Sequence, residues 1–374
     1  MSLELPPTHL DHQYMAQALQ LAQQGLYSTT PNPRVGCVIV KNGLVVGAGA
    51  HLKAGEPHAE VHALRQAQTA CHNDLTGAEV YVTLEPCSHF GRTPPCADAL
   101  VKAGVARVII AMQDPNPQVA GRGITLLKQH HIAVTVGVMA TEARTLNVGF
   151  VSRMTRGLPF VRSKIAASLD GRTALANGES KWITGEAARL DVQHWRAQSC
   201  AILTGSGTVL ADNPRMNVRL NTTEYMRQPL RVVVDSQLAI SPNALILKND
   251  KTLLAYANNA SQKSTQFFAD NVELLQISDH AGKVCLKSLL QALAARGINE
   301  LMVEAGQGLN GALLTQNLID ELIMYQAPII MGNQALGMFA IPSLSNMQQR
   351  IQLELLDVLK IDQDLRLRFK PTFN

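Results

Sequence analysis

Four residues in the first third of the chain have the types and spacing of a catalytic metal site. His58 and Glu60 are followed by Cys87 and then by Cys96. One imidazole and two thiolates suit Zn²⁺ and leave its fourth position open for water, which separates a catalytic zinc from a structural one. Glu60 is in the same first helical turn as His58, where it can reach that water without binding the metal.

The order of these residues agrees with a known chemical signature, His-x-Glu followed by Pro-Cys-x-x-Cys, which marks zinc deaminases. In that chemistry, zinc hydroxide attacks an amidine-like ring carbon and the glutamate carries a proton to the departing amine. The sequence departs from the signature in one respect, because eight residues rather than two separate Cys87 from Cys96. We expect Glu60 to be catalytic and the longer loop to enlarge the pocket wall. The expected ligands of one Zn²⁺ per chain are His58, Cys87 and Cys96.

A structural zinc site is the main alternative. It needs a fourth protein ligand, for which His62 and His89 are the candidates. Glu60 argues against this alternative, because a structural site has no need for a glutamate at that offset. A metalloprotease helix is excluded, since Ala59 stands where that motif requires glutamate.

Length and composition bound the class of protein. The 374 residues, 46% hydrophobic and 17% charged, are enough for two globular domains. No apolar stretch is long enough to cross a bilayer, and the first residues lack the pattern of a secretion signal. Six cysteines spread over a chain of this size favour reduced thiols and a cytoplasmic location. Outside the metal set, Cys37 and Cys71 are typical of ordinary core or surface thiols.

The two halves of the chain differ in charge. Residues 1–150 contain ten basic and ten acidic residues and nine of the eleven histidines, whereas residues 153–231 contain twelve basic against six acidic residues. The first part therefore suits metal chemistry and the second suits anions. A net charge of +4 with 4% aromatic residues speaks against a nucleic-acid partner.

The elements that must position the metal residues follow a β-β-α-β-α-β pattern, which indicates a layered α/β domain over residues 1–147. Asp11 is a plausible N-cap, and Asn42-Gly43 is a two-residue hairpin signal. The expected strands cover 35–40, 44–46, 79–84 and 105–112, and the expected helices cover 11–25, 58–70 and 97–103. A linker is expected over 148–159, where Gly, Ser, Arg and Pro break the periodicity.

A second α/β domain is expected over 160–374. Its predicted strands cover 160–166, 201–204, 230–235 and 301–304, and its predicted helices cover 186–198 and 311–316. No Gly-x-Gly-x-x-Gly segment follows a strand with an acidic residue about 20 positions on, so a Rossmann domain is not indicated. Two other glycine-rich segments, 205–208 and 306–308, each follow a strand, and their backbone N–H groups are suited to phosphate.

Several longer runs resemble one known family, the bifunctional riboflavin-biosynthesis deaminase/reductases. In the first half these runs are PNPRVG at 31–36 and PCSHFGRTPPC at 86–96. In the second half they are KIAASLDGRT at 164–173, WITG at 182–185, TGSGTVLADNPRMNVR at 204–219 and VEAGQGLN at 303–310. The resemblance extends over nearly the whole chain in the expected order.

The resemblance implies a fold and a function for each half. The first domain would be cytidine-deaminase-like and would remove the 2-amino group of 2,5-diamino-6-ribosylamino-4(3H)-pyrimidinone 5′-phosphate. The second would be dihydrofolate-reductase-like and would use NADPH to reduce the ribose, giving 5-amino-6-ribitylamino-uracil 5′-phosphate. The partners would be this small molecule and a second copy of the chain, as a homodimer through the second domain, with neither nucleic acid nor membrane.

The resemblance also implies site residues. On the cofactor side these are Ala166, Trp182, Thr208, Asp212, Ser236, Gly306, Gln307 and Gly308. On the substrate side they are Asn32, His51, Lys164, Ser180, Arg196, Arg215, Met216, Arg219 and Glu304. Asp212 is a hypothetical proton donor, and Lys164 is a second candidate for polarising the sugar.

Each of these residues also has an ordinary structural interpretation. Asn32 can be a turn residue between two prolines, Arg196 a solvated helix residue, and Trp182 part of the core. Two rival functions also stay open at this point. One is a nucleic-acid or nucleoside deaminase fused to an unrelated nucleotide-binding reductase. The other is a non-catalytic zinc module joined to a nucleotide sensor.

Overall fold

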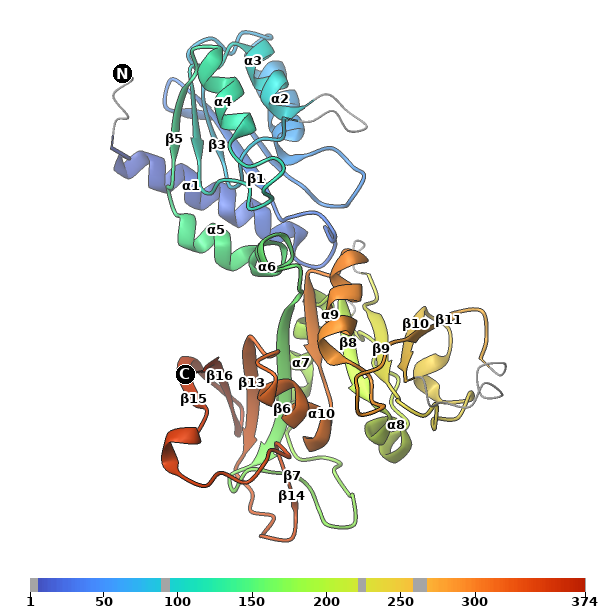
Figure 1. The fold of residues 1–374 in the computed structure, drawn as a ribbon. Helices are drawn as coiled ribbons and strands as arrows, with labels where there is room; N and C mark the ends of the chain where they lie inside the picture. The colour runs from blue at the N-terminus through green and yellow to red at the C-terminus, as the bar shows by residue number, and fades with distance from the viewer. Residues whose placement is uncertain (1–5, 89–94, 221–226, 258–267, 374) are drawn as a thin grey trace. The chain divides into compact units, whose positions relative to one another are not determined.

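The chain divides into two compact units, one ending at Gly157 and one beginning at Leu158. The computed structural model describes residues 6–88, 95–220, 227–257 and 268–373 (Figure 1). Each unit has its own sheet and its own buried core. Within these ranges, every helix is too short or too polar to cross a membrane.

The first unit is a five-stranded mixed sheet with helices packed on it. The strands are β1 (Gly36–Lys41), β2 (Leu44–Ala50), β3 (Glu79–Val82), β4 (Arg107–Ile110) and β5 (Ala133–Val136). Their order is β2-β1-β3-β4-β5, with β1 antiparallel to both neighbours and β3, β4 and β5 parallel. The helices are α1 (His9–Ala22), α2 (Ala59–Ala70), α3 (Cys96–Ala103), α4 (Arg122–Gln129), α5 (Ala140–Leu146) and α6 (Val148–Arg156), with a 3₁₀ turn η1 (Gln23–Gly25) after α1.

The predicted layered α/β class is confirmed for this unit, and the hairpin turn is also as expected. Asn42 and Gly43 both have positive φ, at 53° and 75°, as a tight two-residue turn requires. The N-cap of the first helix was predicted wrongly. Thr8 caps α1 through a capping box, and Asp11 is the third helical residue of that box.

The division between the two units falls inside the segment predicted as a linker, 148–159, but most of that segment is helix α6, so the prediction of an irregular linker is wrong. Phe150 of α6 is buried in the core of the first unit, and Val151 and Met154 pack against that core. Gly157 ends the helix in the left-handed conformation, at φ 67°. Apolar residues three and four apart were present in the sequence, but the mixture of Gly, Ser and Arg around them masked the periodicity.

Two glycines of β2 let helix α2 approach the sheet closely. A Cβ atom on Gly49 would lie 2.4 Å from the carbonyl oxygen of Ala59, and one on Gly47 would lie 2.2 Å from that of Ala63. Both distances are far below van der Waals contact. The absence of side chains at these positions therefore sets the depth at which α2, which begins directly after His58, sits on the sheet.

The second unit is a nine-stranded sheet. In spatial order its strands are β11 (Val272–Gln276), β10 (Thr252–Tyr256), β9 (Leu230–Val234), β8 (Ala201–Gly205), β12 (Glu300–Val303), β6 (Phe160–Ser168), β13 (Glu321–Ala327), β16 (Asp364–Thr372) and β15 (Gln352–Ile361). The first seven run parallel, and β16 and β15 are antiparallel to their neighbours. The helices are α7 (Glu186–Gln198), α8 (Ser206–Asp212), α9 (Leu286–Ala295) and α10 (Gln307–Thr315); β7 (Arg172–Ala174) pairs with β14 (Leu336–Gly337), and η2 (Leu245–Leu247) and η4 (Met347–Gln349) are 3₁₀ turns.

Both faces of this large sheet are buried. Successive strand residues, such as Ile202 and Leu203 or Met302 and Val303, belong to two different hydrophobic clusters. Because side chains alternate along a strand, the two clusters lie on opposite faces. One cluster includes Val192 of α7, and the other includes residues of α9 and α10. Helix α7 therefore covers one face of the sheet, and α9 and α10 cover the other.

The predicted second α/β domain is confirmed, although several of its elements were not foreseen. The glycine-rich segment 205–208, for which no helix was predicted, opens helix α8, and α10 begins four residues before the predicted start at 311. Strands β13, β15 and β16, which complete one edge of the sheet, had no counterpart in the prediction.

Candidate active sites

The three expected metal ligands converge in the first unit. The Nδ1 atom of His58 lies 3.3 Å from Sγ of Cys96 and 3.7 Å from Sγ of Cys87, and the three ligand atoms lie within 4.8 Å of one another. His58 is the N-cap of α2, and Cys96 is the first residue of α3. The backbone N–H of Cys96 also donates to Sγ of Cys87 at 3.3 Å. Two helix N-termini thus meet at the metal ligands, and the start of α3 favours the thiolate form of Cys87.

This donor set fits a tetrahedral zinc ion. Ligands about 2.0–2.3 Å from such an ion are separated by roughly 3.3–3.8 Å, which matches the spacing of His58 and the two sulfurs. Hydrogen bonds from Cys96 and His58 hold the pKa of the Cys87 thiol well below its usual range. The site is therefore prepared for a cation before one binds.

Glu60 is buried, with 3% of its surface exposed, in the first turn of α2. Burial, helped by the nearby Cys87 thiolate, raises the pKa of Glu60 to about 7 when no cation is present. A divalent cation beside it would lower this pKa, because an opposite charge favours the carboxylate. Glu60 can thus hold or release a proton under mild conditions, as a general acid–base must.

No fourth protein ligand joins the three among the residues that the structure describes. His62, one candidate for that position, is not part of the converging group. The other candidate, His89, lies outside the described residues. Cys37 is fully buried in the hydrophobic core, as expected for an ordinary core thiol, whereas Cys71 is half-buried and packs against that core.

Asn32 and His51 lie beside the metal ligands. The Asn32 side-chain amide donates to Nε2 of His51 at 3.1 Å, and Nδ1 of His51 lies 3.1 Å from the carbonyl oxygen of Pro57. The ring of His51 packs edge-on against that of His58, with 5.4 Å between the ring centres. Burial lowers the pKa of His51, which keeps the ring neutral. Asn32 is also a turn residue, since its backbone N–H donates to the carbonyl oxygen of Thr29 at 2.9 Å. Its backbone therefore forms the turn while its side chain contacts His51.

Glu85 supports the site and was not among the predicted residues. It is buried three residues after the end of β3 and two residues before Cys87. Its carboxylate accepts hydrogen bonds from the backbone N–H groups of Asp114, Gly121, Gly123 and Ile124. One carboxylate thus holds the loop that leads into α4 against the strand end from which the Cys87 loop starts. In the sequence, only the position of Glu85 directly before Pro86-Cys87 indicated that it could have a role at the metal site.

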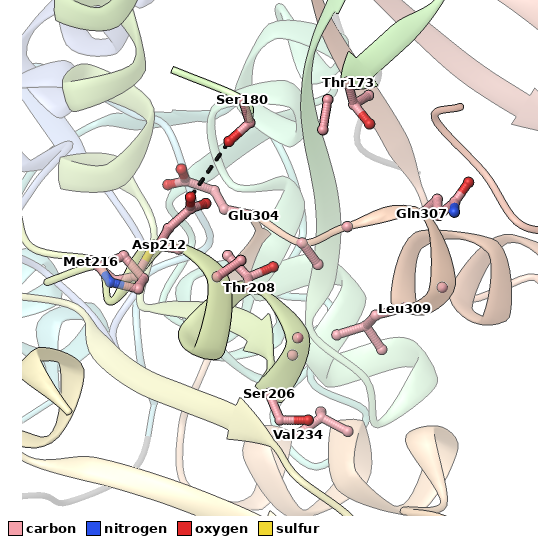
Figure 2. A pocket seen from close by; sticks show the side chains of 18 of the residues that line it. Thr173, Ser180, Ser206, Thr208, Asp212, Met216, Val234, Glu304, Gln307 and Leu309 are labelled. Atoms are coloured by element: carbon pink, nitrogen blue, oxygen red, sulfur yellow. Dashed lines mark hydrogen bonds between the residues drawn. The ribbon is translucent and has the colours of Figure 1, made fainter. Parts of the chain in front are cut away.

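The second unit contains a cavity of about 1400 Å³. Every residue that the resemblance implies for the reductase site lines it, although these residues come from widely separated parts of the chain (Figure 2). They are Lys164, Ala166, Ser180, Trp182, Arg196, Thr208, Asp212, Arg215, Met216, Arg219, Ser236, Glu304, Gly306, Gln307 and Gly308.

Three charged side chains form a buried cluster in this cavity. Nε and Nη2 of Arg196 donate to the two carboxylate oxygens of Glu304 at 2.6 and 2.9 Å, and Nη1 donates to the carbonyl oxygen of Asn217 at 3.0 Å. Although burial raises the pKa of Glu304, Arg196 and then Lys164 outweigh it and leave this pKa below its usual value. Burial lowers the pKa of Lys164. Arg196 is therefore not a solvated helix residue, and its donors are engaged by protein groups.

Asp212 and Trp182 also take definite positions in the cavity. Ser180 Oγ donates to Oδ1 of Asp212 at 3.4 Å, a bond drawn in Figure 2. Trp182 is 73% exposed, so the interpretation of this residue as core is wrong. The guanidinium of Arg189 lies over its ring, 4.5 Å from the ring centre. Trp182 therefore offers a large aromatic face to the cavity from a supported position.

The N-termini of two helices line the cavity. Helix α8 begins after its N-cap Gly205, and α10 begins after its N-cap Gly306. A Cβ atom on Gly207, Gly306 or Gly308 would meet no other atom within 4 Å. The backbone is thus open to a ligand, and such positions favour phosphate groups. This arrangement fits a dinucleotide with a charged pyrophosphate.

Comparison with known proteins agrees with both units. Residues 8–112 match the family described as the cytidine and deoxycytidylate deaminase zinc-binding region, and residues 159–367 match the RibD C-terminal domain. Riboflavin biosynthesis protein RibD of Escherichia coli is 49% identical over 368 residues, which cover 96% of this chain and 98% of that protein.

Solved structures give the same result. A structure of RibD from Acinetobacter baumannii has a TM-score of 0.89 at 48% identity and covers 97% of this chain and 99% of that chain. A structure from Thermotoga maritima has a TM-score of 0.86 at 33% identity, with 97% and 99% covered. The latter protein is described as a diaminohydroxyphosphoribosylaminopyrimidine deaminase/5-amino-6-(5-phosphoribosylamino)uracil reductase.

These relatives span both units, so neither the metal-site unit nor the cavity unit is an unrelated addition. The deaminase match contains His58, Glu60, Cys87 and Cys96, and the RibD C-terminal match contains the whole set of cavity residues. The rival functions that joined a deaminase to an unrelated reductase, or made the zinc unit a non-catalytic module, are therefore excluded. The chain belongs to the RibD family of bifunctional riboflavin-biosynthesis enzymes, which join a deaminase and a reductase.

Proposed function

We propose that this chain catalyses two consecutive reactions on one pyrimidine ribonucleotide. The first unit removes the 2-amino group of 2,5-diamino-6-ribosylamino-4(3H)-pyrimidinone 5′-phosphate as ammonia. The second unit reduces the opened ribose of the product with NADPH, giving 5-amino-6-ribitylamino-uracil 5′-phosphate. The observation that carries the proposal is the convergence of His58, Cys87 and Cys96 near a buried Glu60.

In the deaminase site, His58, Cys87 and Cys96 would hold one Zn²⁺, which would act as a Lewis acid and lower the pKa of water. Glu60 takes a proton from the attacking water and delivers it to the departing amine. Its burial supports this role, because an unsolvated carboxylate exchanges protons more readily near neutral pH. Asn32 and the neutral His51 bind the pyrimidine beside the ligands.

In the reductase site, the residues that line the cavity would hold NADPH, which would supply the hydride needed to reduce the sugar carbon that bears nitrogen. Asp212 donates the accompanying proton, and Ser180, which bonds to it, orients the carboxyl group. Lys164 is the second candidate for polarising the sugar, because it is buried next to Glu304. Arg196 is occupied by its pair with Glu304, so the substrate phosphate is bound by two other arginines of the cavity, Arg215 and Arg219.

The cofactor would lie along the two glycine-rich helix starts. The N-termini of α8 and α10 would hold its pyrophosphate, and Thr208, Gln307 and Ser236 line the same cavity. Trp182 presents its ring to the cofactor. The excess of arginine in this unit suits the 2′-phosphate that distinguishes NADPH from NADH.

A coupled assay with metal analysis tests both halves of the proposal. The purified full-length chain should contain about one zinc per chain and should release ammonia from the diaminopyrimidine phosphate. NADPH should be consumed only after ammonia is released, because the reductase acts on the deaminated product. Ammonia release from tRNA in preference to the free nucleotide, or NADPH oxidation without prior deamination, would contradict the proposal.

We further propose that the chain is a homodimer through the second unit. Strand β15 is the outer strand of the nine-stranded sheet, so one of its backbone edges has no strand partner among the described residues. Five of its apolar side chains are between 44% and 55% exposed: Leu353, Leu355, Leu356, Val358 and Leu359. An exposed apolar edge strand of this length favours pairing with a second copy.

The six cysteines support a reducing compartment. None of them is paired in a disulfide, and two are assigned to the metal. We propose that the enzyme acts in the cytoplasm, where such thiols stay reduced.

A further inference from the structure

Strand β16 carries three charged residues, two positions apart, that all contact helix α7. Side chains at alternate positions of a strand lie on one face, so Asp364, Arg366 and Arg368 point the same way. They span about 13 Å of strand. Their partners on α7, from residue 185 to residue 195, span about 15 Å of helix. The two spacings match, so the contacts form a continuous line along the helix.

The first two contacts hold the start and the middle of α7. Oδ2 of Asp364 accepts a hydrogen bond from the N–H of Gly185, the N-cap of the helix, at 2.8 Å. Nη1 of Arg366 donates to both carboxylate oxygens of Asp191, at 3.2 and 3.0 Å. The Tyr325 hydroxyl from β13 donates to the same carboxylate at 2.5 Å. Asp191 is thus held by two donors from the sheet.

The third contact is made by Arg368 with the ring of Trp195, near the end of α7, where two further arginines also lie close to the ring. The guanidiniums of Arg162 and Arg368 each lie 5.4 Å from the centre of its ring, and that of Arg366 lies 5.7 Å away. Arg368 is itself fixed by Glu321, to which its Nε donates at 2.5 Å. Cations over an indole ring attract it, most strongly where water is excluded. The ring is therefore locked among side chains of the sheet.

Helix α7 connects this line of contacts to the reductase cavity. Arg196 directly follows Trp195 and forms a bidentate ion pair with Glu304. This pair fixes the buried cluster of Arg196, Glu304 and Lys164. A shift of α7 along its axis would move the Arg196 guanidinium away from that carboxylate. Glu304 would then lose the bonds that fix its carboxylate, and the negative charge that acts on Lys164 would no longer be held in one place.

We propose that Asp191 and Arg366 are positioning residues of the reductase site, which act through α7 on Arg196 and Glu304. Neither Asp191 nor Arg366 lines the cavity. This inference rests on the proposed reductase function. The strand that carries Arg366 is thereby part of the catalytic architecture, although it lies beyond the last cavity residue in the sequence.

Steady-state kinetics of the full-length variants D191N and R366Q test the inference. The KM for the deaminated pyrimidine phosphate should rise between about 10-fold and about 100-fold, because small displacements of positioning groups have effects of this size. The Kd of NADPH, measured by fluorescence titration, should stay within about twofold, as should ammonia release by the first unit. Amide hydrogen exchange in α7 should become faster. The double variant should be no worse than the poorer single variant, because the two residues act as a pair.

Two further variants control for general damage. Asp357 accepts from Nη2 of Arg366 at 3.0 Å, and its removal in D357N should leave the substrate KM unchanged. R366K keeps the charge but cannot bind both carboxylates with one planar fork, so its KM should be intermediate. An unchanged substrate KM in D191N and R366Q overturns the inference. If D191N and R366Q also lose NADPH binding, R366K decides between the two explanations. A raised substrate KM in R366K with intact NADPH binding supports the inference, and a wild-type substrate KM in R366K overturns it. Failure of the wild-type chain to oxidise NADPH would instead count against the proposed function.

Discussion

At the scale of single residues, burial separates the chemically unusual side chains from the ordinary ones. Glu60 and Glu304 are both buried carboxylates, but their partners differ. Burial, together with the Cys87 thiolate, raises the pKa of Glu60, whereas Arg196 and Lys164 outweigh the effect of burial on Glu304 and lower its pKa. The first is suited to exchanging protons, and the second is suited to holding a fixed negative charge.

The residue Glu60 gives a direct test of the deaminase half. E60Q should reduce ammonia release by about 10²–10⁴-fold, because a general acid–base contributes that much to a rate. Zinc content should stay near one per chain, and reduction of separately supplied deaminated product should be unchanged. The matched control is E56Q, an exposed glutamate on the segment before His58, which should behave as wild type. Substantial deaminase activity in E60Q would remove Glu60 from the mechanism.

At the scale of elements, the metal site depends on how closely α2 lies against β2. G49A should weaken zinc binding and deamination, because the added Cβ would lie 2.4 Å from the backbone of Ala59, directly after His58. Overpacking of this kind costs about 1–3 kcal/mol. Zinc affinity can be measured by competition with a chelator. L44A, at a 71% exposed position of the same strand, is the control and should bind zinc normally. Unaltered zinc affinity in G49A would show that α2 tolerates the shift.

Helix α1 gives a prediction about pH. Asp11 accepts from Arg107 at 2.9 and 3.0 Å and from the N–H of Thr8 at 2.8 Å. Burial raises the pKa of Asp11, but these bonds outweigh it and leave the pKa below its usual value. A carboxyl whose pKa is lower in the folded state stabilises the fold above the unfolded pKa, about 3.9, and this stability is lost as the pH falls through the folded pKa.

D11N should therefore destabilise the first unit at pH 7 by about 1–3 kcal/mol, the cost of losing charge-assisted hydrogen bonds. The difference from wild type should begin to shrink as the pH falls below about 3.9, where Asp11 of the unfolded chain takes up a proton, and should be lost as the pH falls through the lower pKa of Asp11 in the folded state. Hydrogen exchange of peptides from the first unit, in a urea series at several pH values, measures this. E142Q, at an exposed position of α5, is the control. A difference that persists at low pH would mean that the carboxylate charge is not what stabilises α1.

At the scale of the whole molecule, each activity belongs to a unit with its own core, and the proposed dimer belongs to the second unit. L355E on β15 should convert a dimer to a monomer, because it places a charge in the apolar strip of the outer strand. Sedimentation velocity of the full chain measures the change. L10E, at a similarly exposed apolar position of α1, should stay dimeric. A monomeric wild-type chain, or a dimeric L355E, would contradict the proposed interface.

Much of the fold was predictable because its signals are local. The Asn42-Gly43 turn, the helix that starts after His58 and the buried strands of both units follow from residues close together in the sequence. The errors also have local causes. Asp11 has a good N-cap side chain, but Thr8, three residues earlier, forms the box with it. The segment 148–159 looks like a linker by composition, yet its apolar residues are buried in the first unit.

The sequence by itself determined the chemistry of the first unit, because the metal ligands and Glu60 are recognisable by type, order and spacing. Its glycine-rich turns and excess of arginine also indicated that the second unit binds anions. Only the tertiary structure decided that Arg196 pairs with Glu304, that Glu85 supports the metal loop, and that β16 lies along α7. The physical reason is that these contacts join segments tens to more than a hundred residues apart, whereas sequence periodicity reports only neighbours along the chain.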